Sequence, residues 1–104
     1  MFIEERDYCI KPGLAGKFVA LYEAHGLALQ KHYLGRFLGY FITDIGELNR
    51  VVALWGYDSL DARDEARSRM MADPAWQSYL DKVLPLIDSQ QTRIMKPVSF
   101  SPIQ

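Results

Sequence analysis

Five side chains in this sequence combine residue type and spacing in a way that could support binding or catalysis. His32 is the best catalytic candidate, because a neutral imidazole can act as a general base near pH 7. Arg6 could clamp an anionic group, with Tyr8 beside it on the same face of a predicted strand. Trp55 and Tyr57 likewise share a strand face, where they could line a pocket for a flat apolar molecule. The predicted ligand-binding residues are therefore Arg6, Tyr8, His32, Trp55 and Tyr57.

Each of these residues also has a purely structural interpretation. His32 can hydrogen-bond to the backbone, and Trp55 and Tyr57 can pack in a core or a dimer interface. A buried Arg6 would need an acidic partner, which a neighbouring strand could supply. Packing is the simpler interpretation for the aromatic pair and for Arg6.

The sequence contains no pattern that indicates a metal or a cofactor. His25 and His32 are seven residues apart, whereas helical zinc sites place histidines at i and i+4. Cys9 is the only cysteine. No glycine-rich phosphate loop and no series of nucleophile, base and acid is present. We therefore expect no metal and no cofactor.

Length, composition and charge narrow the class of protein. The chain has 104 residues, which predicts one domain spanning residues 1–104. Its formal net charge is −1, without the basic excess that phosphate contacts require, which argues against nucleic-acid binding. No apolar run approaches the roughly 20 residues of a membrane-spanning helix, and the acidic N-terminus does not resemble a signal peptide. These features predict a cytoplasmic protein that does not bind membranes.

Periodicity places the candidates on alternating strands and helices. The predicted strands cover residues 2–10, 36–45, 50–57 and 90–96. The predicted helices cover residues 14–29, 58–71 and 73–84. The apolar face of the first helix is expected to contain Leu14, Phe18, Leu21, His25 and Leu29. Gly26 predicts a bend in that helix.

Local signals at the later elements are also specific. Residues 46–49 have the composition of a hairpin loop, in which Asn49 is expected to stabilise the turn. Asp58 and Ser59 offer a cap for the helix that follows, and Asp73 with Pro74 begins a further helix. The arginines of the helix over residues 58–71 are interpreted as a solvated face, with ion pairs from Asp64 to Arg67 and from Glu65 to Arg69.

The order β-α-β-β-α-β predicts an α+β ferredoxin-like fold, with one antiparallel sheet and the helices on one face. Alternation predicts Phe37, Phe41 and Ile45 on one face of the second strand and Leu38, Tyr40 and Ile42 on the other. Both faces would then be apolar, although the helices can cover only one. A second copy of the sheet is the expected cover, which predicts a homodimer.

Several stretches of the chain resemble the NIPSNAP family. They are "EERDYCIKPG", "HYLGRFLGYF", "GELNRVVALWGYDSLDARDEAR", "DPAWQSYL" and the closing "RIMKP…FSP". The resemblance covers nearly the whole chain, and it implies a ferredoxin-like monomer that pairs into a dimeric α/β barrel. It does not imply one reaction, because the wider barrel group includes haem-degrading and cofactor-free monooxygenases as well as isomerases.

Three functions follow as hypotheses, and the sequence does not decide whether the protein is an enzyme. The favoured one is a homodimer, or an assembly of dimers, that binds a small and largely apolar molecule between sheet and helices. The second is a cofactor-independent or haem-related monooxygenase or isomerase with His32 as general base. The third is a structural or adaptor protein with a filled barrel, whose partners dock on residues 98–104.

Overall fold

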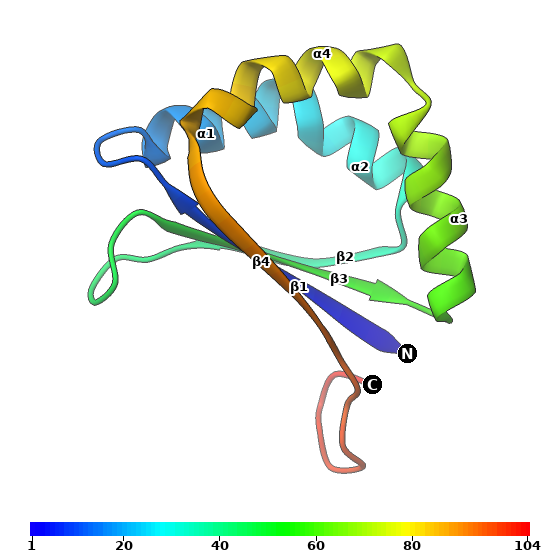
Figure 1. Cartoon of the computed structure of the whole chain (residues 1–104). Helices are drawn as coiled ribbons and strands as arrows, with labels where there is room; N and C mark the ends of the chain where they lie inside the picture. Colours follow the sequence, from blue (N-terminus) through cyan, green and yellow to red (C-terminus); the bar gives the residue numbers. More distant parts are fainter.

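The computed structural model describes residues 1–104 and contains one antiparallel sheet with helices on one face (Figure 1). The strands are β1 (Phe2–Ile10), β2 (Arg36–Ile42), β3 (Arg50–Tyr57) and β4 (Ile87–Met95). The helices are α1 (Ala15–Leu21), α2 (Leu27–Tyr33), α3 (Leu60–Met71) and α4 (Pro74–Val83). A π-helical turn (Tyr22–Gly26) joins α1 to α2, and a 3₁₀ turn (Leu84–Leu86) precedes β4.

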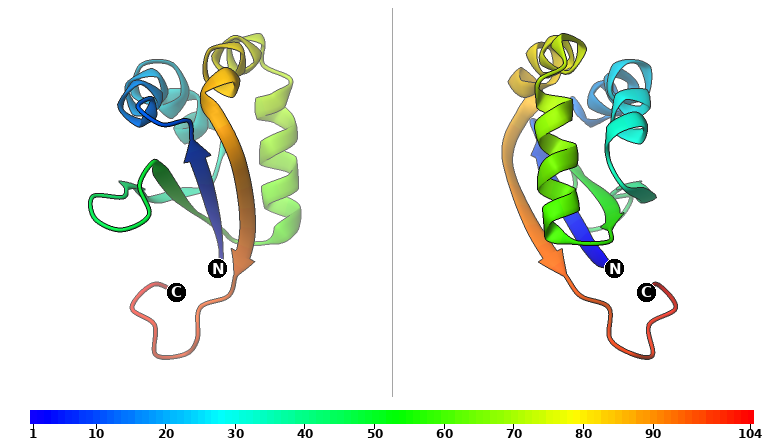
Figure 2. Two further views of the ribbon diagram at one scale, coloured as in Figure 1. Left: turned by 60° about the vertical axis from the view of Figure 1, so that its left-hand side comes forward. Right: turned by 90° about the vertical axis from the view of Figure 1, so that its right-hand side faces the viewer.

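The four strands lie in the order β2-β3-β1-β4, with β1 paired antiparallel to both β3 and β4. This topology is the ferredoxin-like α+β fold, and it confirms the fold class predicted from the sequence. Figure 2 shows α1, α2 and α4 together above the sheet and α3 running down beside the strands, while the segment after β4 extends beyond the end of the sheet. No helix is both long enough and apolar enough to cross a membrane.

A π-helical turn interrupts the first helical segment at the position where Gly26 predicts a bend. The π-helical turn ends at Gly26, and a Cβ atom at that position would lie 2.9 Å from the ring of Tyr79. The buried positions are Phe18, Tyr22, Gly26 and Gln30. The predicted face was therefore wrong in part: His25 is exposed, because the wider π turn brings every fourth residue toward the sheet.

Local capping explains why α3 and α4 are separate helices. The Ser59 side chain accepts a hydrogen bond from the backbone N–H of Ala62 at 3.0 Å, and Asp73 accepts one from Ala75 at 2.8 Å. Pro74 occupies the first turn of α4, where its missing N–H leaves no hydrogen bond unmade. These observations confirm the predicted helix starts. At the hairpin, Asn49 has a φ of 64°, a left-handed conformation that asparagine tolerates well.

The predicted alternation in the second strand was wrong because β2 contains a bulge. The pairing register with β3 shifts between Phe37 and Gly39, and an extra residue moves every later side chain to the opposite face. Phe37 consequently lies on the helix-covered face, with its ring 4.9 Å from that of Trp55. Phe41 lies on the uncovered face and is 55% exposed, whereas Ile45 lies beyond the end of β2.

The uncovered face of the sheet is apolar over only part of its area. Phe41 pairs with Val52 in the register of β2 and β3, and the side chain of Leu54 follows on the same face of β3. On the other half, Glu5 of β1 forms an ion pair with Arg93 of β4 at 3.0 Å. The expectation that both faces are apolar throughout therefore holds for the β2 and β3 half alone.

Candidate functional site

A cavity of about 190 Å³ lies between the sheet and the helical layer. Its wall is mainly apolar and is rich in aromatic rings, contributed by Tyr8, Phe18, Tyr22, Tyr40, Trp55, Trp76 and Tyr79. The ring of Tyr22 stacks on that of Tyr40, with centroids 4.2 Å apart, and Trp76 lies 4.9 Å from Tyr79. Offset aromatic pairs of this kind hold one another in position, so the wall has a defined shape.

One side of the cavity reaches the surface. Among the lining residues, Met71 at the end of α3 and Leu84 after α4 are 51% and 52% exposed. Gln90 of β4 also lines the cavity and is exposed. The opening therefore lies where α3 and α4 face the edge strand β4, and a ligand could enter there without rearrangement of the sheet.

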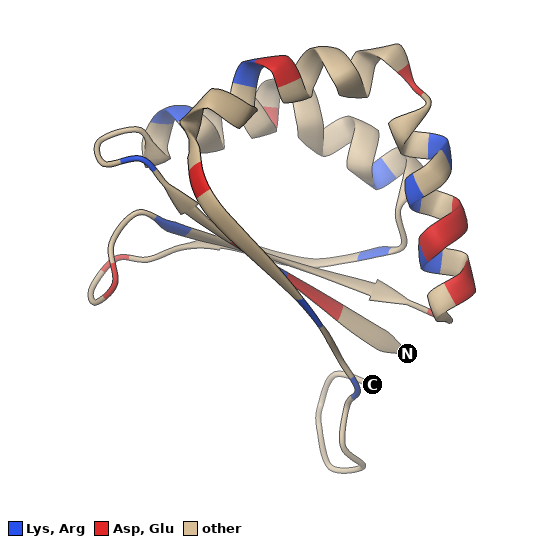
Figure 3. Ribbon diagram, viewed as in Figure 1, with Lys and Arg blue, Asp and Glu red and all other residues tan.

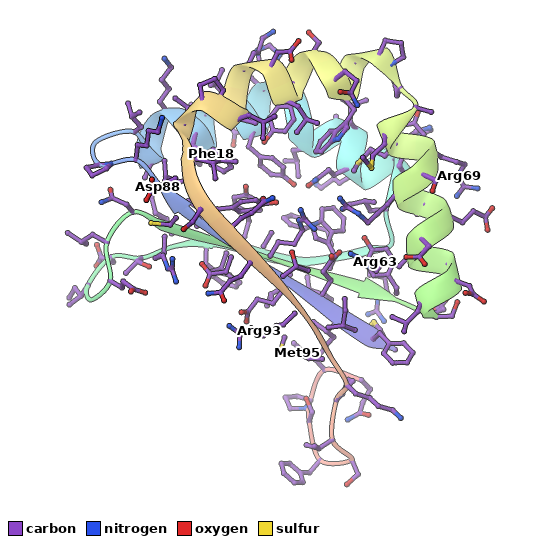
Figure 4. All side chains as sticks on the ribbon, in the orientation of Figure 1. Phe18, Arg63, Arg69, Asp88, Arg93 and Met95 are labelled. Carbon is purple, nitrogen blue, oxygen red and sulfur yellow. The ribbon has the colours of Figure 1, made fainter.

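A buried charge cluster adjoins the cavity. Glu4 of β1 is 0% exposed, and its Oε2 atom accepts hydrogen bonds from Arg63 at 2.6 Å and from Arg6 at 3.2 Å. Figure 4 shows Arg63 directed from α3 toward the sheet, whereas Arg69 on the same helix points away from it. Because Oε2 receives all of these hydrogen bonds, Oε1 is buried without a partner.

Opposing effects set the pKa values in this cluster. Burial raises the pKa of Glu4, but the Arg63 hydrogen bond and the charges of Arg6, Arg63 and Arg67 outweigh it, so the pKa lies below its usual value. For Arg67 the balance is reversed. Burial lowers its pKa, and the positive charge of Arg6 lowers it further. Glu4 is thus held ionised, while Arg67 carries a charge that its surroundings do not neutralise.

Two hydrogen-bond donors in the cavity wall have no protein partner. The indole Nε1 of Trp55 and the Nη1 of Arg67 are both buried and unpaired, although buried polar groups in proteins are nearly always hydrogen-bonded. Arg67 also forms no salt bridge within 4.0 Å. Both residues line the cavity, so a ligand there is a candidate source of the missing acceptor.

Four other polar side chains of the wall are hydrogen-bonded to one another in pairs. Arg6 donates from Nε to the hydroxyl of Tyr8 at 2.8 Å, and the Tyr22 hydroxyl donates to Gln30 at 2.7 Å. Burial raises the pKa of Tyr22 and of Tyr40. These phenols therefore remain neutral at physiological pH and act as part of the aromatic wall.

The structure brings three of the five predicted site residues together. Arg6, Tyr8 and Trp55 line the cavity. Tyr57 is buried beside the charge cluster with an unpaired hydroxyl, but it does not line the cavity, and burial raises its pKa to about 12. His32 lies outside the cavity wall, is exposed, and packs edge-on against Tyr33 at 4.7 Å.

Arg67 and Gln30 belong to the site but were not predicted from the sequence. Arg67 was interpreted as part of a solvated face. The predicted pair of Asp64 with Arg67 does not form, because Asp64 contacts Arg63 instead at 3.2 Å. The predicted pair of Glu65 with Arg69 is confirmed at 3.0 Å. One feature of the sequence could have indicated that Arg67 belongs to the site. Its spacing from Arg63 places both arginines on the same side of a helix.

The fold and the cavity together define a ferredoxin-like α+β domain with a ligand-sized space between sheet and helices. A NIPSNAP family model matches residues 3–102, and the chain belongs to the NIPSNAP family. The Protein NipSnap of Drosophila melanogaster is 33% identical over 101 residues, which cover 97% of this chain and 36% of that protein. The chain thus spans about a third of the length of this curated relative.

Solved structures agree with this assignment along the whole chain. A NIPSNAP family protein from Agrobacterium tumefaciens is 43% identical with a TM-score of 0.97, covering 100% of this chain and 94% of that one. A NIPSNAP-like domain protein from Burkholderia xenovorans is 46% identical with a TM-score of 0.93, covering 97% and 88%. An antibiotic biosynthesis monooxygenase is only 14% identical with a TM-score of 0.65, covering 94% and 99%, which shows a shared fold alone.

Proposed function

We propose that this protein binds a small, largely apolar molecule in the cavity between its sheet and its helices. The observation that carries the proposal is the aromatic-walled space of about 190 Å³, which opens to the surface beside β4. Apolar cavities of about 150 Å³ are large enough to hold a benzene ring. The adaptor hypothesis called for a filled interior, and the cavity argues against it.

The two tryptophans of the chain supply a direct test, because Trp55 and Trp76 both line the cavity. We expect toluene, used as a neutral ring-sized probe, to shift both indole N–H signals in a ¹H–¹⁵N correlation spectrum. The Trp55→Phe variant identifies which signal belongs to which residue. If saturating toluene leaves both signals unchanged, the binding proposal is wrong.

Two alanine-to-leucine variants provide the control, one that fills the cavity and one that does not. Ala53 is buried in the cavity wall, so Ala53→Leu should occupy the space and abolish the toluene-dependent shifts. Ala28 is exposed on α2, and Ala28→Leu adds the same atoms without entering the cavity. We expect the second variant to bind toluene as the unchanged protein does.

Self-association through the uncovered sheet face is the second part of the proposal. Phe41 exposes an aromatic ring there, next to Val52 and Leu54. Apolar patches of this kind commonly mark interaction sites, and a two-fold dimer would pair the same strands of both copies. In such a dimer, the apolar half of the uncovered face, on β2 and β3, would exclude water. The charged half, on β1 and β4, would lie at the rim of the interface.

Native mass spectrometry or sedimentation equilibrium tests this part. We expect twice the subunit mass of 12.0 kDa for the unchanged protein and a monomer for Phe41→Glu, which would bury a charge in the interface. The matched control is Leu60→Glu, which places the same charge at the start of α3 on the other side of the sheet. A monomeric unchanged protein, or a dimeric Phe41→Glu variant, would contradict the proposed interface.

The position of His32 gives no support to the enzyme hypothesis. A general base must lie within hydrogen-bonding reach of its substrate, whereas this imidazole is exposed and outside the cavity wall. The likeness to the monooxygenase fold does not supply a base, since one fold hosts many unrelated functions. We therefore assign no catalytic residue to the cavity.

A further inference from the structure

The geometry points to a small carboxylic acid with an apolar body as the ligand, with its carboxylate bound by Arg67 and the Trp55 indole N–H. This inference rests on the proposed function, since it names the chemical class that the same cavity would hold. Its basis is the set of unpaired donors and the charge of the wall, which the apolar lining by itself does not explain.

Two buried hydrogen-bond donors of the wall residues have no partner in the protein. Trp55 is 0% exposed, and its Nε1–H has no partner. Its single donor is the only polar atom of the indole, so only an external acceptor can satisfy it. Arg67 supplies a second unpaired donor in the same wall. Leaving buried donors unpaired costs free energy, and an oxygen-bearing ligand would remove that cost.

The charged side chains of the cavity wall are all positive. The cavity wall contains two cations, Arg6 and Arg67, and no carboxylate. Glu4 stands outside the wall, and its bonded oxygen is already shared by Arg6 and Arg63. Asp64 also pairs with Arg63 at 3.2 Å, so two carboxylates face three guanidinium groups in the cluster, and Arg67 is the one that neither carboxylate contacts. An anion in the cavity would complete the balance.

The shape of a guanidinium group and the size of the cavity also suit a small carboxylic acid. A guanidinium group presents paired donors in one plane, which match the two oxygens of a carboxylate. The cavity is somewhat larger than one that holds a benzene ring, which leaves room for a ring or short chain together with a carboxylate. The aromatic rings of Tyr22, Tyr40 and Trp76 would contact the apolar body.

The test compares acids with their neutral amides in the same protein. Phenylacetate and hexanoate are titrated beside phenylacetamide and hexanamide, with the indole N–H signals of Trp55 and Trp76 as the readout. We expect each acid to bind at least about tenfold more tightly than its amide, as a charge-assisted hydrogen bond implies. The Trp55 proton should also move downfield, because its N–H acquires an acceptor.

Two arginine variants of α3 test whether Arg67 causes the tighter binding of the acids. Arg67→Gln should reduce acid affinity to that of the amide, and its fold should survive because Arg67 makes no hydrogen bond to lose. Arg69 is exposed and points away from the sheet, so Arg69→Gln removes an equal charge and should leave acid affinity unchanged. Trp55→Phe should weaken the acid more than the amide.

The possible outcomes distinguish the carboxylate assignment from the more general proposal that the cavity binds a ligand. Equal binding of acids and amides, or a preference for acids that survives Arg67→Gln, would overturn the carboxylate assignment while leaving the cavity as a binding site. Failure of the acids, the amides and toluene to bind would overturn both. Acid selectivity that disappears in Arg67→Gln and persists in Arg69→Gln would establish both.

Discussion

Replacing Glu4 with glutamine is expected to lower the free energy of unfolding by about 3 kcal/mol. The carboxylate is fully buried and accepts hydrogen bonds from Arg63 and Arg6. An amide of the same shape keeps one oxygen acceptor but removes the negative charge, so the arginines of the cluster would be left without a counter-charge. Partial exposure of the Arg63 side chain places the loss at the lower end of the range for a broken buried pair.

Urea unfolding at neutral pH measures this loss, and a second glutamate supplies the control. Glu65 is exposed and pairs with Arg69 on the surface of α3, along which Figure 3 shows acidic and basic residues alternating. Glu65→Gln should therefore change stability by less than about 0.5 kcal/mol. A Glu4→Gln variant that is as stable as the Glu65→Gln variant would contradict the role assigned to the cluster.

The same carboxylate predicts how stability depends on pH. Its pKa in the folded protein lies below its usual value, so folding favours the ionised form. The resulting stabilisation is complete above the unfolded pKa and is lost as the pH falls through the folded pKa. We expect the stability difference between the unchanged protein and Glu4→Gln to be largest near neutral pH and to shrink on acidification below about pH 4.3.

Replacing Gly35 with alanine is expected to destabilise the protein by about 3 kcal/mol, although the residue is exposed. Gly35 joins α2 to β2, and a Cβ atom there would overlap the carbonyl oxygen of Gly56 in β3 and press on the ring of Tyr57. A backbone oxygen within a strand cannot move aside as a flexible side chain can. The clash would therefore displace the start of β2 from its neighbour.

Gly16 provides the matched control for this prediction. A Cβ atom at Gly16 would meet nothing within 4 Å, and the residue lies in the helix α1. Gly16→Ala should therefore raise stability by up to about 1 kcal/mol through reduced freedom of the unfolded chain. Thermal or urea unfolding measures the stability of both variants, and the difference between them reports the cost of the clash. A Gly35→Ala variant as stable as Gly16→Ala would show that the close approach to Gly56 imposes no constraint.

Much of the local structure was determined by the sequence itself. Pro and Gly ended elements where their backbone chemistry requires it, and Ser59, Asp73 and Pro74 started helices through caps that depend on neighbouring residues alone. The element order then led to the ferredoxin-like fold, because few topologies satisfy that order with short connections. The family assignment followed from stretches that span nearly the whole chain.

The uncovered sheet face was decided only by the tertiary structure. The bulge after Phe37 inverted the alternation of β2. The side chains of a strand alternate between its two faces, so a single extra residue placed Phe37 and Phe41 on opposite faces, although the alternation predicts the same face for both. Arg6 and Tyr8 share one face of β1, as predicted, because no register shift occurs between Phe2 and Cys9.

The identity of the binding residues also required the folded chain. Local spacing could not distinguish Arg67, which faces the cavity, from Arg69, which faces solvent, because that depends on how α3 is rotated against the sheet. His32 stood out by residue type, but type carries no information on where a helix directs its side chains. The sequence determined which residues could bind an anion, and the packing of α3 on β1 and β3 decided which of them face the cavity.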